Sequence, residues 1–217
     1  MDKSLYSLML MDSVVSEIDK ICLREGTNRS NLVNQILAEY VSLMTPEKRI
    51  DNIFRNIEKL VSETSELVPF VTPNQRTMSM KSSLEYKYRP TIKYVVQLYR
   101  VPNGAIGELI VNFRTQSEAL LSDMAEFFRM WKRLEDAYIA RYYEPDAIRY
   151  ELYDTRLVRT IAVPKNKNYS NEELGSAISA YVKMFDELMK SYLSGTNGPK
   201  ELEKRYLAYL NQGIGLV

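Results

Sequence analysis

The stretch from Leu5 to Val41 constrains the fold most, because it is too short to bury its own apolar side chains. Residues 5–10 alternate in a period of two, which predicts a β-strand. The pleat sorts their side chains as follows: Tyr6, Leu8 and Leu10 on one face, and Leu5, Ser7 and Met9 on the other. A lone strand of this length cannot satisfy its backbone hydrogen bonds. We therefore expect it to pair, most simply with the same strand of a second copy.

Two helices are expected to follow this strand. The first runs from Asp12 to Glu25, and its apolar residues recur at helical spacing. These residues are Val14, Val15, Ile18, Ile21 and Cys22. Gly26 supplies a left-handed residue that ends this helix, and Asn28 can cap the next one. The second helix runs from Asn31 to Val41 and places one apolar stripe on a single face: Leu32, Val33, Ile36, Leu37, Tyr40 and Val41.

The order of strand, helix, the turn Gly26-Thr27-Asn28-Arg29-Ser30 and helix resembles the ribbon-helix-helix superfamily of DNA-binding proteins, the Arc, MetJ and CopG-like repressors. The resemblance implies that two chains pair their strands into a ribbon that enters the major groove of double-stranded DNA. The side chains that it implies towards the bases are Leu5, Ser7 and Met9. Those that it implies at phosphates are Lys3, Asn28, Arg29 and Ser30. Those that it implies in the dimer core are Tyr6, Leu8, Leu10, Ile18, Ile36 and Tyr40.

Two observations keep a different use of this module open. Leu5 and Met9 carry no hydrogen-bonding groups for base edges, which such ribbons normally read with polar side chains. Residues 1–45 hold four Lys or Arg against six Asp or Glu, so the module gains little from counterion release on DNA. The alternative is a dimerisation module whose ribbon face binds protein or is covered.

Histidine is absent and Cys22 is the single cysteine. Because Cys22 lies on the apolar stripe of the first helix, we expect it in the core rather than in a reactive site. The chain also lacks a phosphate-binding loop, a dinucleotide-binding motif and a serine nucleophile elbow. We therefore expect no enzyme activity, no cofactor and no metal site. No apolar run reaches the roughly eighteen residues of a membrane span, and we expect a cytoplasmic protein without membrane contact.

The middle of the chain is expected to form a connecting helix over residues 46–67 and a linker over residues 68–91. Thr45 and Pro46 mark the start of the helix, as N-cap and first helical residue. The linker is rich in proline and basic overall, with Arg76, Lys81, Lys87 and Arg89 against Glu85, and with Tyr86 and Tyr88 between them. It is either an arm that binds a phosphate backbone or a solvated linker with a short strand.

Residues 92–217 show an internal repeat of a β-hairpin followed by a long helix. The β-rich runs are Ile92 to Tyr99, Ala105 to Phe113, Ile148 to Tyr153 and Arg156 to Val163, and the helices begin at Ser117 and Ser170. We therefore predict an α+β protein. It has an N-terminal ribbon-helix-helix dimerisation module (residues 1–45), then the connecting helix and linker, then a domain of duplicated hairpin-plus-helix units. In that domain a four-stranded antiparallel sheet is backed by two long helices.

Tyrosine and arginine are concentrated in the second half of the chain. The tyrosines are Tyr138, Tyr142, Tyr143, Tyr150, Tyr153 and Tyr169, with Arg141, Arg149, Arg156 and Arg159 between them. They are typical of core packing, a protein interface or a surface that stacks RNA bases. Two functions follow. One is a dimeric DNA-binding transcriptional repressor, in which the C-terminal domain serves for sensing or assembly. The other is an adaptor that uses the N-terminal module only to form a homodimer or higher homo-oligomer and binds a protein or RNA through its C-terminal half.

Overall fold

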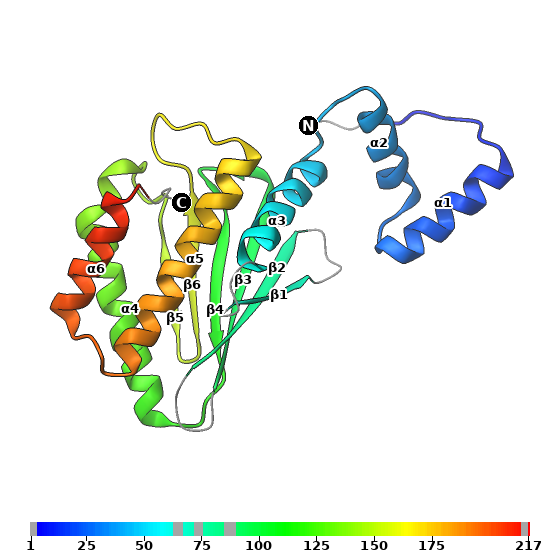
Figure 1. Cartoon of the computed structure of the whole chain (residues 1–217). Helices are drawn as coiled ribbons and strands as arrows, with labels where there is room; N and C mark the ends of the chain where they lie inside the picture. The colour runs from blue at the N-terminus through cyan, green and yellow to red at the C-terminus, as the bar shows by residue number, and fades with distance from the viewer. Residues whose placement is uncertain (1–3, 63–66, 72–75, 85–89, 214–216) are drawn as a thin grey trace. The chain divides into compact units, whose positions relative to one another are not determined.

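The computed structural model describes residues 4–62, 67–71, 76–84, 90–213 and 217 (Figure 1). The chain divides into two compact units, Met1–Lys48 and Arg49–Val217. The two units are described separately below. Lys3, Glu85, Tyr86, Lys87, Tyr88 and Arg89, which the sequence analysis named, lie outside the described residues.

The first unit contains two helices, α1 (Asp12–Glu25) and α2 (Arg29–Tyr40), within two residues of their predicted bounds. Gly26 ends α1 in the left-handed conformation with φ 62°, and its N–H donates to the carbonyl of Cys22. The Asn28 side chain accepts a hydrogen bond of 3.0 Å from the N–H of Asn31 and caps α2. The local signals in this part of the sequence therefore set the helix boundaries.

The predicted N-terminal strand is wrong for the single chain. Residues 4–11 form no strand, and the described part of the chain begins with helices and reaches its sheet only after them. A strand requires an edge that accepts its backbone hydrogen bonds, and no described strand pairs with residues 5–10. The predicted fold, a ribbon-helix-helix module followed by a four-stranded sheet, is therefore corrected.

The second unit contains one antiparallel sheet of six strands in the order β1-β2-β3-β4-β6-β5. The strands are β1 (Val68–Val71), β2 (Thr77–Ser83), β3 (Thr91–Asn103), β4 (Ala105–Phe113), β5 (Tyr150–Tyr153) and β6 (Arg156–Ala162). The two extra strands come from residues 68–91, where prolines suggested a linker. In β2, Met78 and Met80 are buried and pair with Val96 and Tyr94 of β3. Burial of these side chains stabilises the strand, although the prolines of this segment favour a linker.

Four helices contribute side chains to the core of this unit: α3 (Pro46–Ser62), α4 (Glu118–Tyr138), α5 (Asn171–Leu193) and α6 (Pro199–Asn211). Ser117 caps α4, and Ser170 with Glu173 forms a capping box at the start of α5. The Asn56 amide of α3 donates to the carbonyl of Glu172 at 2.8 Å, and Lys183 of α5 donates to the carbonyl of Leu60 at 2.6 Å. Figure 1 shows α3 and α5 on the same side of the sheet.

Alternate residues of β3 and β4 are buried in the core. In β3, Ile92, Tyr94 and Val96 are fully buried in one core cluster with side chains from α3, α4, α5 and α6, whereas Lys93 and Gln97 are exposed. This alternation is the period of two expected for a sheet with one face against the core and the other towards solvent. No helix of the described residues is long and apolar enough to cross a membrane.

Candidate nucleic-acid interface

The side chains predicted to face DNA bases, Leu5, Ser7 and Met9, are exposed, with Leu5 98% and Met9 102% accessible. The opposite set, predicted to be covered in a dimer, is exposed too: Tyr6, Leu8 and Leu10. A single chain therefore leaves both sides of this segment uncovered.

The predicted phosphate contacts are only partly available. The Asn28 side chain caps α2, and Ser30 is exposed in the first turn of that helix. Arg29 binds Asp19 of α1 through two hydrogen bonds, Nε to Oδ1 and Nη2 to Oδ2. Hydrogen bonding to Arg29 lowers the pKa of Asp19, and the same bond raises the pKa of Arg29. The Arg29 guanidinium, which the resemblance assigns to a phosphate, is therefore already bound to the Asp19 carboxylate.

The first unit has a very small core. Ile18, Cys22 and Leu32 form its buried cluster, with Ile21 and Val33 packed against it. Two residues predicted for the dimer core, Ile36 and Tyr40, are exposed in the single chain, Tyr40 to 88%. Further exposed apolar side chains of this unit are Met11, Val14, Leu23, Leu37, Val41, Leu43 and Met44. The unit therefore shows more large apolar side chains to solvent than it buries.

The uncovered face of the sheet carries a row of side chains that crosses all six strands. Successive members of this row are direct neighbours in the strand register: Val68, Lys81, Lys93, Asn112, Arg156 and Tyr153. We call it the cationic row. It holds three basic residues and no acidic residue. Since neighbouring strands lie about 4.8 Å apart, the row is about 24 Å long.

The basic side chains of the cationic row are exposed. Lys81 and Lys93 lie directly opposite each other in β2 and β3, an arrangement of like charges that destabilises a sheet. Arg114 follows β4 and adds a fourth cation beside the row. Among the described residues, no carboxylate forms an ion pair with Lys81, Lys93, Arg114 or Arg156. Among the described residues, the positive charge of this surface is therefore available to an anion.

Two aromatic rings lie at the two edges of this face. On the β1 edge, the Lys81 Nζ lies 5.4 Å from the centre of the Phe70 ring. On the β5 edge, the Arg156 Cζ lies 4.5 Å from the centre of the Tyr153 ring. Both rings are about half exposed, Phe70 to 55% and Tyr153 to 49%. A ring with a cation beside it can stack a base while the cation contacts a phosphate.

A hollow of about 790 Å³ lies over the middle of the cationic row, where Lys81, Lys93 and Asn112 line it. This volume is in the range of sites that bind small molecules or nucleotides. Its lining is mainly polar and basic: Lys81, Thr91, Lys93, Asn112, Phe113, Arg114 and Thr155. The concave part of the face thus coincides with its positive charge.

Sequence reasoning identified part of this surface. Lys81 was assigned to a basic linker, and Arg156 and Tyr153 to the tyrosine- and arginine-rich half. Lys93, Asn112, Arg114 and Phe70 were missed. The alternation of buried Ile92 and Tyr94 around Lys93 marks the lysine as outward-facing, but the partners across the sheet depend on register, which one sequence does not reveal.

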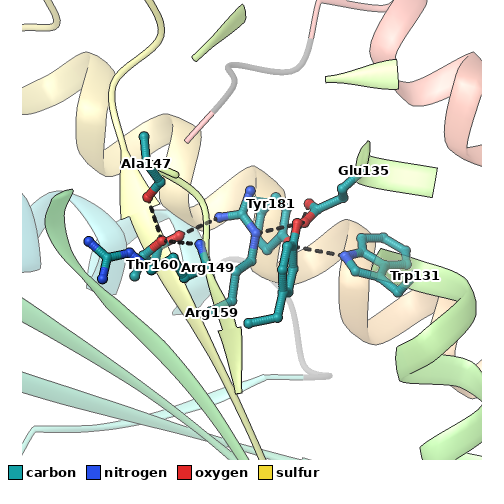
Figure 2. Close-up of polar contacts among 8 residues, drawn as sticks. Trp131, Glu135, Ala147, Arg149, Arg159, Thr160 and Tyr181 are labelled. Atoms are coloured by element: carbon teal, nitrogen blue, oxygen red, sulfur yellow. Dashed lines mark hydrogen bonds and ion pairs between the residues drawn. The ribbon is translucent and has the colours of Figure 1, made fainter. Parts of the chain in front are cut away.

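Most of the other tyrosines and arginines in this half are structural. Figure 2 shows a buried polar cluster in which Arg159 of β6 and Glu135 of α4 form an ion pair, Nε to Oε2, of 2.8 Å. Both residues are 1% exposed. The Tyr181 hydroxyl donates to Glu135 Oε1 at 2.8 Å and accepts from Trp131 Nε1 at 2.9 Å. The Tyr150 hydroxyl of β5 also donates to Glu135.

This cluster joins α4, α5, β5 and β6 and fixes the β5 edge of the sheet. The Arg159 guanidinium stacks on Tyr181 with its Cζ 4.4 Å from the ring centre, and its Nη1 donates to the carbonyl of Thr160. Burial raises the pKa of Tyr150 and of Tyr181, and the Glu135 carboxylate adds to both shifts. These hydroxyls therefore stay protonated and act as donors to Glu135. Within the described part of the chain, Arg159 Nη2 and the Tyr143 hydroxyl have no hydrogen-bond partner.

The described residues hold no group of three or more His, Cys, Asp or Glu side chains placed to bind a metal ion. The comparisons with protein families, with curated proteins and with solved structures gave no match to this chain. The function is therefore inferred from the two exposed surfaces, the apolar first unit and the cationic row.

Proposed function

We propose that this protein is a non-enzymatic adaptor that forms a homodimer through its first unit and binds a partner through the uncovered face of its sheet. The observation that carries the proposal is the exposure of the first unit. Its buried cluster has three residues, whereas units of about forty residues need a large core, a metal, disulfides or oligomerisation to be stable. Its only cysteine is free, so oligomerisation is the route that fits.

A second copy is the occupant that fits this surface best. The exposed apolar side chains of the first unit are mainly aliphatic, as in Leu5, Met9 and Leu23, and burying such groups drives association. Residues 1–45 carry a net charge of about −2, from four basic and six acidic residues, so repulsion between two copies is small. Each copy offers the other an apolar surface of the same kind, as in symmetric dimers.

The test compares the association of full-length variants. Leu5→Ser with Met9→Ser removes two exposed side chains that a second copy is expected to cover. Each contributes about 1.5–3 kcal/mol when buried and occurs twice in a dimer, so we expect the dissociation constant to rise by more than about 100-fold. Sedimentation equilibrium is expected to give twice 25.2 kDa for the wild type and 25.2 kDa for the variant at low micromolar concentration.

Val101→Ser is the matched control, because Val101 is also an exposed aliphatic residue, 72% accessible, but lies on β3 of the second unit. This variant is expected to remain dimeric. A wild-type protein that stays monomeric at these concentrations, or a double variant that associates as tightly as the wild type, contradicts the proposal. Circular dichroism checks that α1 and α2 are retained.

A DNA-binding transcriptional repressor is a second candidate. Exposed Ser30 lies in the first turn of α2, where free backbone N–H groups attract an anion. The occupied Arg29 and the acidic charge of the unit weigh against it. A gel shift with duplex DNA from upstream of its own gene separates the candidates. Salt-sensitive binding that is lost in Ser7→Ala or Arg29→Ala favours the repressor, and no binding favours the adaptor.

A further inference from the structure

The cationic row has the features of a site for an extended polyanion. Lys81 and Lys93 face each other across adjacent strands, and this like-charge pair costs stability in the free protein. Arg156 continues the row two strands further on, beyond Asn112. A single small anion cannot contact cations spread over most of a row about 24 Å long. A chain of phosphates can.

The aromatic rings add a second requirement for the ligand. Phe70 and Tyr153 are about half exposed, lie on opposite edges of the sheet and each have a cation against the ring. Two residues along each strand from the cationic row, and so on the same face, lie half-buried Val95 and Ile110 and buried Val158. A row of cations next to apolar and aromatic side chains matches a ligand with a charged backbone and flat apolar faces.

We propose that the uncovered sheet face binds single-stranded nucleic acid. Its phosphates lie along Lys81, Lys93, Arg114 and Arg156, and its bases stack on Phe70 and Tyr153. This inference rests on the proposed function only in taking the sheet face as the partner surface, and it does not require the dimer. It names the partner class of that surface.

A single strand fits better than a duplex or an acidic protein. The bases of a duplex are stacked on one another and cannot lie on exposed rings, whereas unpaired bases can. An acidic peptide matches the cations but gives Phe70 and Tyr153 no flat partner. Two carboxylates also lie on this face, Glu108 and Glu151, and each accepts a hydrogen bond from a tyrosine hydroxyl, Tyr99 and Tyr153 respectively. They lie in rows other than the cationic row.

The first experiment measures binding of the full-length protein to fluorescent oligouridine and oligodeoxythymidine by polarisation, over a series of salt concentrations. A contact between a cation and a phosphate of a single strand contributes about 0.7 to the slope of log affinity against log salt, so four contacts predict a slope of about −3. Duplex DNA of the same length and polyglutamate are expected to bind at least about tenfold more weakly, because neither stacks on the rings.

The second experiment uses variants on and off the face. Lys81→Met with Lys93→Met is expected to lower the slope by about 1.4 and the affinity at about 0.1 M salt by about 25-fold. Removing this like-charge pair keeps or raises the stability of the sheet, so lost binding is not lost folding. Lys59→Met with Lys200→Met is the control, because these exposed lysines lie on α3 and α6.

The rings are tested separately from the charges. Tyr153→Leu is expected to weaken binding by at least about fivefold, the effect of losing one stacked base, with the salt slope unchanged. Tyr142→Leu is its matched control, since Tyr142 also lies against an arginine, with the Arg141 Cζ 4.9 Å from its ring centre, but sits in the 3₁₀ turn Ala140–Tyr142 outside the sheet.

Several results overturn the inference. It is refuted if the variant of Lys81 and Lys93 loses no more affinity than the control variant of Lys59 and Lys200, or if Tyr153→Leu does not weaken binding. It is also refuted if duplex DNA binds as tightly as the single strands. Tighter binding of polyglutamate than of the oligonucleotides indicates an acidic protein partner instead. The Leu5→Ser, Met9→Ser variant separates this inference from the dimer. A monomeric protein that binds oligouridine through Lys93 refutes only the dimer, and a dimeric protein that binds no oligonucleotide refutes only the inference.

Discussion

The buried ion pair between Glu135 and Arg159 gives the sharpest test of how the second unit is held together. Glu135→Leu removes the carboxylate that pairs with Arg159, a residue that is 1% exposed and whose Nη2 has no hydrogen-bond partner among the described residues. Breaking a buried pair by removing one partner costs about 3–5 kcal/mol, because the remaining charge stays buried. A domain is stable by about 5–15 kcal/mol. This single change therefore removes a large part of the stability.

The loss is measured by urea unfolding. Trp131 is the only tryptophan and donates to Tyr181 within the cluster, so its fluorescence reports on this region directly. With a typical dependence of about 2–3 kcal/mol per molar urea, the midpoint is expected to fall by about 1–2 M. Asp136→Asn is the matched control on the same helix, because it breaks the half-exposed pair with Lys132, and we expect it to cost less than about 1 kcal/mol.

The decisive variant carries a second substitution. Adding Arg159→Met to Glu135→Leu removes the uncompensated charge, so the double variant is expected to be more stable than Glu135→Leu alone, although Tyr150 and Tyr181 still lack their acceptor. A double variant less stable than Glu135→Leu shows that the two side chains contribute through packing and not through their charges. That result refutes the reasoning.

Two further predictions concern the same unit. Burial raises the pKa values of the Tyr94, Tyr143 and Tyr206 hydroxyls well above the usual tyrosine value near 10. Above pH 10 these hydroxyls therefore keep their protons in the native state and release them in the unfolded chain. Each of these tyrosines then removes about 1.4 kcal/mol of stability per pH unit. We expect cooperative alkaline unfolding in which tyrosinate absorbance and circular dichroism change together, and ionisation near pH 10 with native circular dichroism contradicts this. Gly107→Ala places a Cβ 2.3 Å from the carbonyl oxygen of Gln97, so we expect a loss of about 1–3 kcal/mol in urea unfolding. A change below about 0.5 kcal/mol shows that the β3–β4 hairpin can yield.

The parts of the fold that depend on local chemistry could be predicted from the sequence. Gly26, Asn28 and Ser117 act within a few residues of their own position, and each stops or caps a helix as expected. The N-terminal strand could not be judged in the same way. The alternating pattern of residues 5–10 indicates that a strand is possible. The strand forms only where another strand accepts its backbone hydrogen bonds, and no described strand of the single chain pairs with it.

The candidate site was harder to predict, because its residues meet only through strand register. Lys81 lies in a segment whose prolines indicate a linker, and the neighbouring residues that make it a strand, Met78 and Met80, reveal their role only when buried against β3. Lys93 and Arg156 are more than sixty residues apart in the chain, yet they lie two strands apart in one row. Long-range pairing of this kind leaves no local signal in a single sequence.

The pleat of β5 and β6 explains why the tyrosines and arginines could not be assigned together. Arg156 and Arg159 are three residues apart on one strand, so they point to opposite faces of the sheet, and Tyr153 and Tyr150 are separated in the same way on the neighbouring strand. Arg159 and Tyr150 meet Glu135 in the core, whereas Arg156 and Tyr153 stack on each other in solvent. The two pairs therefore predict different phenotypes. Substitution of Arg159 lowers the urea midpoint, whereas substitution of Arg156 leaves the midpoint unchanged and weakens oligonucleotide binding. An Arg156 variant that lowers the urea midpoint refutes the assignment of Arg156 to the solvent face. An Arg159 variant that weakens oligonucleotide binding without lowering the midpoint refutes the assignment of Arg159 to the core.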